Sequence, residues 1–186
     1  MDIFKQKYGI ELPSKELWIF GYGSLMWNPG FEFEQCSTGR LFGHHRSLCL
    51  WSVRFRGTEK KPGLVLGLRP GGSCKGMVFK LSNSSRKPNL QYIFNREMIT
   101  NAYHPVVKSV HLDNGKSVTS LTFVSKTSHP QYAHKMSEPE MLKIIKRASG
   151  PRGSNTEYIL NTVEHLESIG ISDKTLDSIA SKLIVN

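Results

Sequence analysis

The chain has 186 residues, of which 38% are hydrophobic and 16 are glycine, a composition that favours one globular domain with its own core. It contains no run of 18 apolar residues and no secretion-signal pattern, and its three cysteines are scattered, which excludes a spanning helix and argues against a disulfide scaffold. These features predict a cytoplasmic protein without a membrane partner.

The net charge of +10 is concentrated between residues 36 and 137, where sixteen Lys or Arg face only three acids, Glu59, Glu97 and Asp113. Such a region favours an anionic partner, either nucleic acid or small carboxylates, although scattered lysines also serve solubility.

The first two thirds of the chain read mainly as short strands. Aromatic and β-branched runs separated by Gly- and Pro-containing breaks predict strands at residues 17–22, 41–53, 64–68, 76–81, 106–112 and 117–124. Asn114-Gly115 between the last two is a strong hairpin signal. One helix, residues 89–98, interrupts this series, with Leu90, Ile93, Phe94 and Glu97 at helical spacing.

The last third changes to helices. Ser137-Glu138-Pro139-Glu140 forms a capping box that opens a helix through Arg147, and Ser154 to Glu157 repeats this pattern before a second helix that ends at Gly170. Ser172 is expected to cap a third helix. Strands first and helices last predict an α+β fold, and many short strands in a small chain often close into a barrel.

A glycine loop, Gly21-Tyr22-Gly23-Ser24-Leu25, follows the first strand directly. It matches neither a phosphate-binding GxxxxGK[ST] loop nor a G-x-S-x-G nucleophile elbow. Backbone N–H groups in such a turn are unobstructed and suit a carboxylate ligand, although the pattern also fits a plain tight turn.

Glu97 stands out as an acid inside the basic region. Beside Arg96 it has the pattern of a solvated surface charge, whereas partial burial would give it the pKa of a general base.

The seven histidines show no metal-ligand spacing, because His44 and His45 are strand neighbours that face opposite sides. Cys74 has no activating partner in the sequence and is interpreted as structural.

An ordered set of motifs between residues 17 and 170 resembles the ChaC family of γ-glutamylcyclotransferases, especially its bacterial branch. The motifs are, in chain order, Phe20-Gly21-Tyr22-Gly23-Ser24-Leu25-Met26-Trp27-Asn28-Pro29, Arg56-Gly57-Thr58, Lys61-Pro62-Gly63, Gly71-Gly72-Ser73-Cys74-Lys75-Gly76, Arg96-Glu97-Met98 with Tyr103 and Pro105, and Ser149-Gly150-Pro151-Arg152-Gly153-Ser154-Asn155-Thr156-Glu157-Tyr158. Each motif is weak alone, but their order is specific.

The resemblance implies a small mixed β-barrel flanked by helices, with residues 1–16 as an N-terminal extension and 17–186 as one γ-glutamylcyclotransferase-like domain. It implies that glutathione is cleaved to 5-oxoproline and cysteinylglycine, with Glu97 as the general acid/base. The implied substrate-binding residues are Ile19, Phe20, Gly21, Tyr22, Gly23, Ser24, Leu25, Tyr103 and Tyr158. Eukaryotic members carry a second acid two turns before the catalytic glutamate, but this chain has the basic stretch 86–89 there, so substrate preference or pocket gating is expected to differ.

The implied reaction needs no metal, nucleotide or other cofactor, because the γ-glutamyl group carries its own amine nucleophile and carbonyl electrophile. Arg46, Arg54 or Arg56 is expected to hold a substrate carboxylate. Two alternatives remain open. One is a cyclotransferase for other γ-glutamyl amines or dipeptides. The other is a non-catalytic nucleic-acid-binding domain, for which Trp51, Arg54, Phe55 and Arg56 supply a faint aromatic and basic pattern. The sequence leaves the oligomeric state open.

Overall fold

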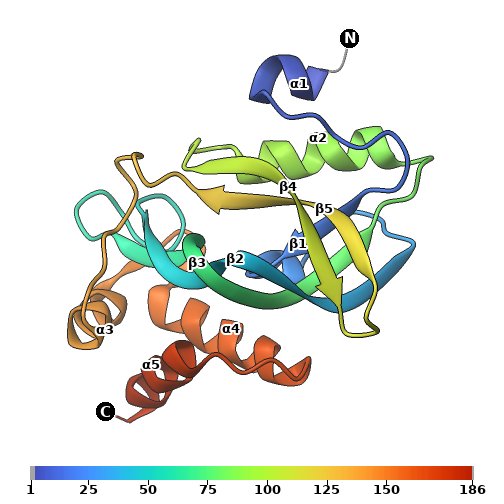
Figure 1. The fold of residues 1–186 in the computed structure, drawn as a ribbon. Coiled ribbons are helices and arrows are strands. Elements are labelled where there is room, and N and C mark those ends of the chain that lie inside the picture. The colour runs from blue at the N-terminus through green and yellow to red at the C-terminus, as the bar shows by residue number, and fades with distance from the viewer. Residues whose placement is uncertain (1–2, 186) are drawn as a thin grey trace. The chain divides into compact units, whose positions relative to one another are not determined.

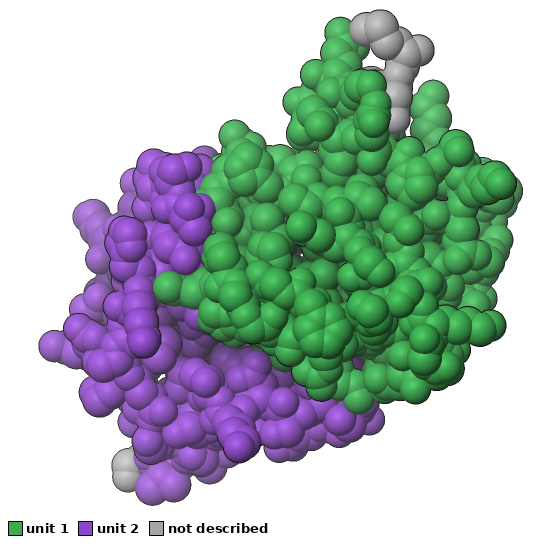
Figure 2. Space-filling view, in the orientation of Figure 1, with its two compact units in different colours: residues 1–46, 68–126 green, residues 47–67, 127–186 purple. Residues whose placement is uncertain are grey.

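The computed structural model describes residues 3–185, so Met1, Asp2 and Asn186 of the expected segments 1–16 and 17–186 lie outside it. The chain forms two compact units, one of residues 1–46 and 68–126 and the other of residues 47–67 and 127–186. Figure 2 colours them separately.

A closed barrel with strand order β1-β3-β2-β4-β5 dominates the fold (Figure 1). Its strands are β1 (Trp18–Gly21), β2 (Gln35–Ser52), β3 (Gly63–Lys80), β4 (Tyr103–Leu112) and β5 (Ser117–Ser125). The β1–β3, β2–β4 and β4–β5 pairs are antiparallel, whereas β1 and β5 are parallel. This mixed barrel, together with the helices, confirms the predicted α+β class.

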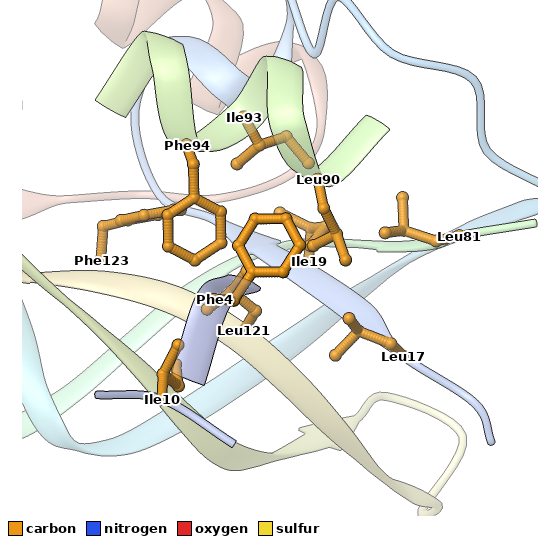
Figure 3. Packing of buried hydrophobic residues seen from close by; sticks show 10 residues of the cluster. All are labelled: Phe4, Ile10, Leu17, Ile19, Leu81, Leu90, Ile93, Phe94, Leu121 and Phe123. Carbon is orange, nitrogen blue, oxygen red and sulfur yellow. The ribbon is translucent and has the colours of Figure 1, made fainter. Parts of the chain in front are cut away.

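The first unit also contains helices α1 (Ile3–Tyr8) and α2 (Arg86–Glu97) and the short 3-10 helix η1 (Ser24–Met26). Helix α2 packs its apolar face against the outer side of β1 and β5, where Phe94 meets Phe123 with ring centroids 5.6 Å apart (Figure 3). Tyr8 of α1 stacks on the same Phe94 ring at 4.5 Å, and the tilted ring of Phe4 contacts it at 4.8 Å. One hydrophobic cluster therefore fixes α2, and with it the residues at its C-terminal end.

The second unit is mostly helical. It contains α3 (Glu138–Arg147), α4 (Asn155–Ser168), α5 (Lys174–Ile184) and the two-stranded ribbon of β6 (Ser149–Gly150) and β7 (Gly153–Ser154). The expected capping box at Ser137 and Glu140 is present, and Ser154 caps α4 by accepting a hydrogen bond from the Glu157 N–H. Both helix starts are therefore confirmed.

Three details of the sequence interpretation were wrong. Residues 64–68 and 76–80 belong to the single strand β3, because Gly71 and Gly72, at φ 92° and 68°, absorb the expected break inside the strand. Helix α2 begins at Arg86, because Pro88 occupies its first turn, where proline's missing N–H costs nothing. Asp173, not Ser172, caps α5 by accepting from the Leu176 N–H.

Candidate active site

Glu97 ends α2, one helical turn after Ile93 and Phe94, which are both fully buried. Because residues three and four apart share a helix face, its side chain turns toward the same apolar core. The Glu97 side chain is only 17% exposed. Burial raises the pKa of this carboxyl above its ordinary value, while the neighbouring charge of Arg96 acts in the opposite direction. The partial burial required of a general base is therefore present.

Arg96 joins this carboxylate to the glycine loop. Its Nε lies 3.2 Å from Glu97 Oε1, and its Nη2 donates to Ser24 Oγ at 3.0 Å. Its Nη1 donates to the carbonyl oxygens of Asn28 and Pro29, at 2.5 and 3.3 Å. One planar guanidinium thus holds Glu97 against the segment from Ser24 to Pro29. Sequence reasoning missed this role, because an Arg-Glu pair on a helix is the usual pattern of a solvated surface.

The glycine loop leaves β1 at Gly21 and turns directly into η1. The Met26 N–H donates to the Gly23 carbonyl at 2.8 Å, and the Asn28 N–H donates to the Ser24 carbonyl at 2.9 Å. Within residues 3–185, the N–H groups of Gly23, Ser24 and Leu25 have no such acceptor. The loop therefore presents three consecutive backbone donors on the segment that Arg96 ties to Glu97.

Gly76 of β3 allows the chain to pass close to the loop. A Cβ at this position would lie 2.3 Å from the Gly21 carbonyl oxygen and 2.9 Å from the Phe20 ring. Only glycine fits such an approach. The motif Gly71 to Gly76 thus acts by allowing the start of the glycine loop to lie against β3.

The side chains at the start of the loop are buried. Ile19 belongs to the cluster under α2, and the Phe20 side chain, also fully buried, lies against Gly76. The Tyr22 hydroxyl donates to the Phe123 carbonyl at 2.8 Å, and Tyr103, the first residue of β4, packs against the same cluster. The structure therefore gathers the predicted site residues Ile19 to Leu25, Glu97 and Tyr103 in the first unit.

Tyr158 lies in the second unit. Its hydroxyl accepts a hydrogen bond from the Leu66 N–H at 3.2 Å, and the Arg56 guanidinium stands over its ring at 5.6 Å. Arg56 also donates to the Ser154 carbonyl and lies 3.5 Å from the Glu157 carboxylate. The motif residues around Gly57, Gly63 and Gly150 are thus packed with Tyr158 in one polar assembly.

Of the three arginines considered as carboxylate ligands, Arg46 is engaged with the backbone. Its Nε donates to the Tyr22 carbonyl and its Nη2 to the Lys75 carbonyl, both at 2.7 Å. This arginine fixes the peptide between Tyr22 and Gly23 and so orients the Gly23 N–H. Arg56 has the partners given above, and Arg54 is exposed.

Within residues 3–185, no group of three His, Cys, Asp or Glu side chains has the arrangement of a metal site. None of the helices described in that range has the length and apolar character needed to cross a membrane. Cys49 and Cys74 are buried free thiols, and Cys36 is an exposed one.

The structure thus combines a mixed five-stranded barrel with a buried glutamate held beside a glycine loop, the combination that the resemblance to the γ-glutamylcyclotransferases implied. The model of the family described as ChaC-like protein matches residues 17–185, and the chain belongs to this family, which confirms the resemblance. The glutathione-specific γ-glutamylcyclotransferase of Escherichia coli is 37% identical over 163 residues, covering 88% of this chain and 71% of that protein. Glutathione-specific γ-glutamylcyclotransferase 1 of Danio rerio is 29% identical and covers 90% and 89%. A crystal structure of a yeast γ-glutamyl cyclotransferase specific to glutathione superposes with a TM-score of 0.81 at 20% identity, covering 90% of this chain and 95% of that one.

Proposed function

We propose that the chain is a glutathione-specific γ-glutamylcyclotransferase, in which Glu97 moves the proton. Its substrate is glutathione, and its products are 5-oxoproline and cysteinylglycine. The observation that carries the proposal is the buried Glu97 carboxylate, which Arg96 holds beside the N–H groups of the glycine loop. The relatives named above support the choice of glutathione as substrate.

The chemical obstacle is the substrate's α-ammonium group, which has no lone pair for attack. Glu97 accepts one proton from it, and the raised pKa of this carboxyl brings base and amine closer in proton affinity. Arg96 acts against that rise, because its charge favours the ionised carboxylate that accepts the proton. Burial and ion pair together therefore adjust one group for both accepting and returning a proton.

The freed amine attacks the γ-carbonyl carbon and forms the C–N bond of a five-membered lactam. Holding the γ-glutamyl chain curled for this attack contributes up to about 7–11 kcal/mol in well-aligned intramolecular reactions. The oxygen of the tetrahedral intermediate gains negative charge, and the N–H groups of Gly23, Ser24 and Leu25 are suitable donors for it. The buried side chains of Ile19 and Phe20 shape this loop from below.

The amide C–N bond to cysteine then breaks as protonated Glu97 returns its proton to the leaving amine. The second proton of the attacking nitrogen passes to the same amine through the freed Glu97 carboxylate, so the lactam is neutral and cysteinylglycine leaves as an ammonium. No water is consumed, since the two products together contain every atom of glutathione. The chain's own residues thus suffice for the reaction without a metal or cofactor. Tyr22 and Tyr103 lie in the same region of the first unit, and Tyr158 is the proposed substrate-binding residue of the second.

The family match spans both compact units, which supports residues 17–186 as one catalytic domain preceded by an extension. A cytoplasmic location is part of the proposal, because three free thiols and a thiol substrate fit a reducing compartment.

The test is to incubate purified protein with glutathione and measure both products by mass spectrometry. We expect equal amounts of 5-oxoproline and cysteinylglycine from wild type and none from Glu97→Gln. Glu59→Gln is the matched control, because Glu59 is an exposed acid of the same basic region. Retention of more than a few per cent of the rate in Glu97→Gln would remove Glu97 as the base. Turnover of γ-glutamyl-alanine, with none of glutathione, would move the substrate to other γ-glutamyl compounds.

A further inference from the structure

The barrel is closed, but the ladder between β2 and β4 is short. The ladder consists of three residue pairs, which are Gly39 with Leu112, Arg40 with His111, and Leu41 with Val110. Gly43 follows at φ 83°, a backbone conformation that turns β2 out of the register. Beyond this point, within the first unit, the described residues of β2 and β4 form no further pairs. We call residues 43–46 and 104–108 the open seam.

The five barrel strands contain no Asp or Glu, although they contain six Lys or Arg: Arg40, Arg46, Arg69, Lys75, Lys80 and Lys108. Lys75 and Lys80 are paired with carboxylates outside the strands, and Arg46 is bound to carbonyl groups. The Lys108 side chain, by contrast, makes no hydrogen bond or ion pair within residues 3–185. The open seam therefore contains a positive charge that nothing in the described chain neutralises.

His44 lies across the seam from Lys108. Its Nδ1 is buried without a hydrogen-bond partner in the described chain, an arrangement that costs free energy unless a ligand completes it. Burial first, and the charge of Lys108 second, lower the pKa of His44, so its ring is neutral near pH 7. Ser120 is opposite Lys108 in the β4–β5 register and shares its face of the sheet, and its fully buried Oγ also lacks a partner.

Arg46 connects the seam to the glycine loop. Its Nε donates to the Tyr22 carbonyl, and His44 is two residues earlier on the same strand, about 6–7 Å from Arg46 along the backbone. The cysteinylglycine part of glutathione extends about 7 Å at most beyond the scissile amide. A substrate with its γ-glutamyl head at the loop would thus direct its terminal carboxylate along β2 toward His44.

Resting on the proposed function, we propose that His44 and Lys108 form the subsite for the C-terminal carboxylate of the γ-glutamyl peptide. The His44 Nδ1–H and the Lys108 ammonium each donate to one carboxylate oxygen. The seam then selects γ-glutamyl peptides with a free C-terminal carboxylate at this distance over simple γ-glutamyl amines. It also accounts for the absence of acids from the barrel strands.

Steady-state kinetics with two substrates test this assignment. One is glutathione, and the other is glutathione with its glycine carboxylate converted to a carboxamide. We expect Lys108→Met to raise KM for glutathione about tenfold while kcat changes less than twofold, because one charge-assisted hydrogen bond is lost. Wild type should show a similar rise in KM with the amide, and Lys108→Met should add little to it.

Lys116→Met is the matched control, since it removes the same charge from the exposed β4–β5 turn. Equal effects of both lysine substitutions would overturn the proposal in favour of general electrostatic attraction. An equal rise in KM for both substrates in Lys108→Met would overturn it as well.

A binding measurement separates this proposal from the proposed function. The His44 ring resonances are followed by NMR in Glu97→Gln during titration with glutathione and with its amide. Bound glutathione should raise the pKa of His44, because a carboxylate favours the charged ring, and the amide should leave it unchanged. If wild type does not turn over glutathione but the His44 pKa still rises in the variant, the proposed reaction is contradicted and the subsite is not. If the His44 pKa is unchanged at saturating glutathione, the subsite is overturned.

Discussion

Arg96 Nη2 lies 3.0 Å from Ser24 Oγ, so residues 72 positions apart are joined within the candidate active site. Through this bond the helix that presents Glu97 and the loop that presents backbone donors are held in one arrangement. The same guanidinium lies 3.2 Å from Glu97 Oε1. Arg96 therefore influences both where the carboxylate stands and how readily it is ionised.

Replacing Arg96 by Met should shift the acid limb of the pH–rate profile to higher pH. The pKa of Glu97 is already raised by burial, and Arg96 is the group that acts against that rise. Removing the cation favours the protonated carboxyl, so the ionised base appears only at a higher pH. The measurement is kcat/KM for glutathione against pH. Arg96→Lys should shift the limb less, and Lys87→Met, at the exposed start of α2, should leave it in place. An unmoved limb in Arg96→Met would contradict a direct electrostatic effect on Glu97.

Ser24→Ala tests the link from the side of the loop. It removes the acceptor for Arg96 Nη2, and the loss of one hydrogen bond to a charged group costs about 1.5–3 kcal/mol at most. We expect kcat to fall roughly tenfold, with the pH profile unchanged, since the ion pair with Glu97 remains. Ser37→Ala, at the start of β2, is the control. A pH shift equal to that of Arg96→Met would mean that Ser24 acts by moving Arg96.

The sequence was sufficient for the fold class, because the fold class depends on local signals. The alternation of residues in the strands, the hairpin at Asn114-Gly115 and the capping boxes at Ser137 and Ser154 are all read within a few positions. The glycine loop was equally visible, since two glycines directly after a strand are rare enough to be noticed.

What the sequence could not supply depends on contacts between distant positions. Arg96 and Glu97 have the local pattern of a surface pair, and only packing against Phe94 and its neighbours makes their environment apolar. Arg46 was a candidate for a substrate carboxylate, yet it is bound to the carbonyls of Tyr22 and Lys75. The sequence also did not show that β3 is one continuous strand, because Gly71 and Gly72 look like a turn unless the partner strand is known.

Gly76→Ala should destabilise the protein and damage the loop. The added Cβ would lie 2.3 Å from the Gly21 carbonyl oxygen, and this backbone atom moves only if β1 and β3 separate. We expect a loss of about 1–3 kcal/mol in the free energy of unfolding, measured with urea, and a fall in kcat. Gly115→Ala is the contrast, since its Cβ meets nothing within 4 Å and its cost arises from φ 84° alone. A fully stable Gly76→Ala would show that the strands are not in close contact there.

Glu97→Gln should make the folded protein more stable at neutral pH while it abolishes turnover. A carboxyl whose pKa is raised on folding binds more protons folded than unfolded, so its contribution to stability falls as pH rises above the unfolded value near 4.5. Above that pH the buried charge opposes folding, and a neutral amide of the same shape removes the penalty. Urea unfolding should therefore show the variant ahead of wild type at pH 7, with the difference vanishing below pH 4.5. Glu59→Gln should show no such pH dependence. If Glu97→Gln were instead less stable than wild type at pH 7, the ion pair with Arg96 would outweigh the cost of burying the carboxylate, and Glu97 would be a structural anchor as much as a base.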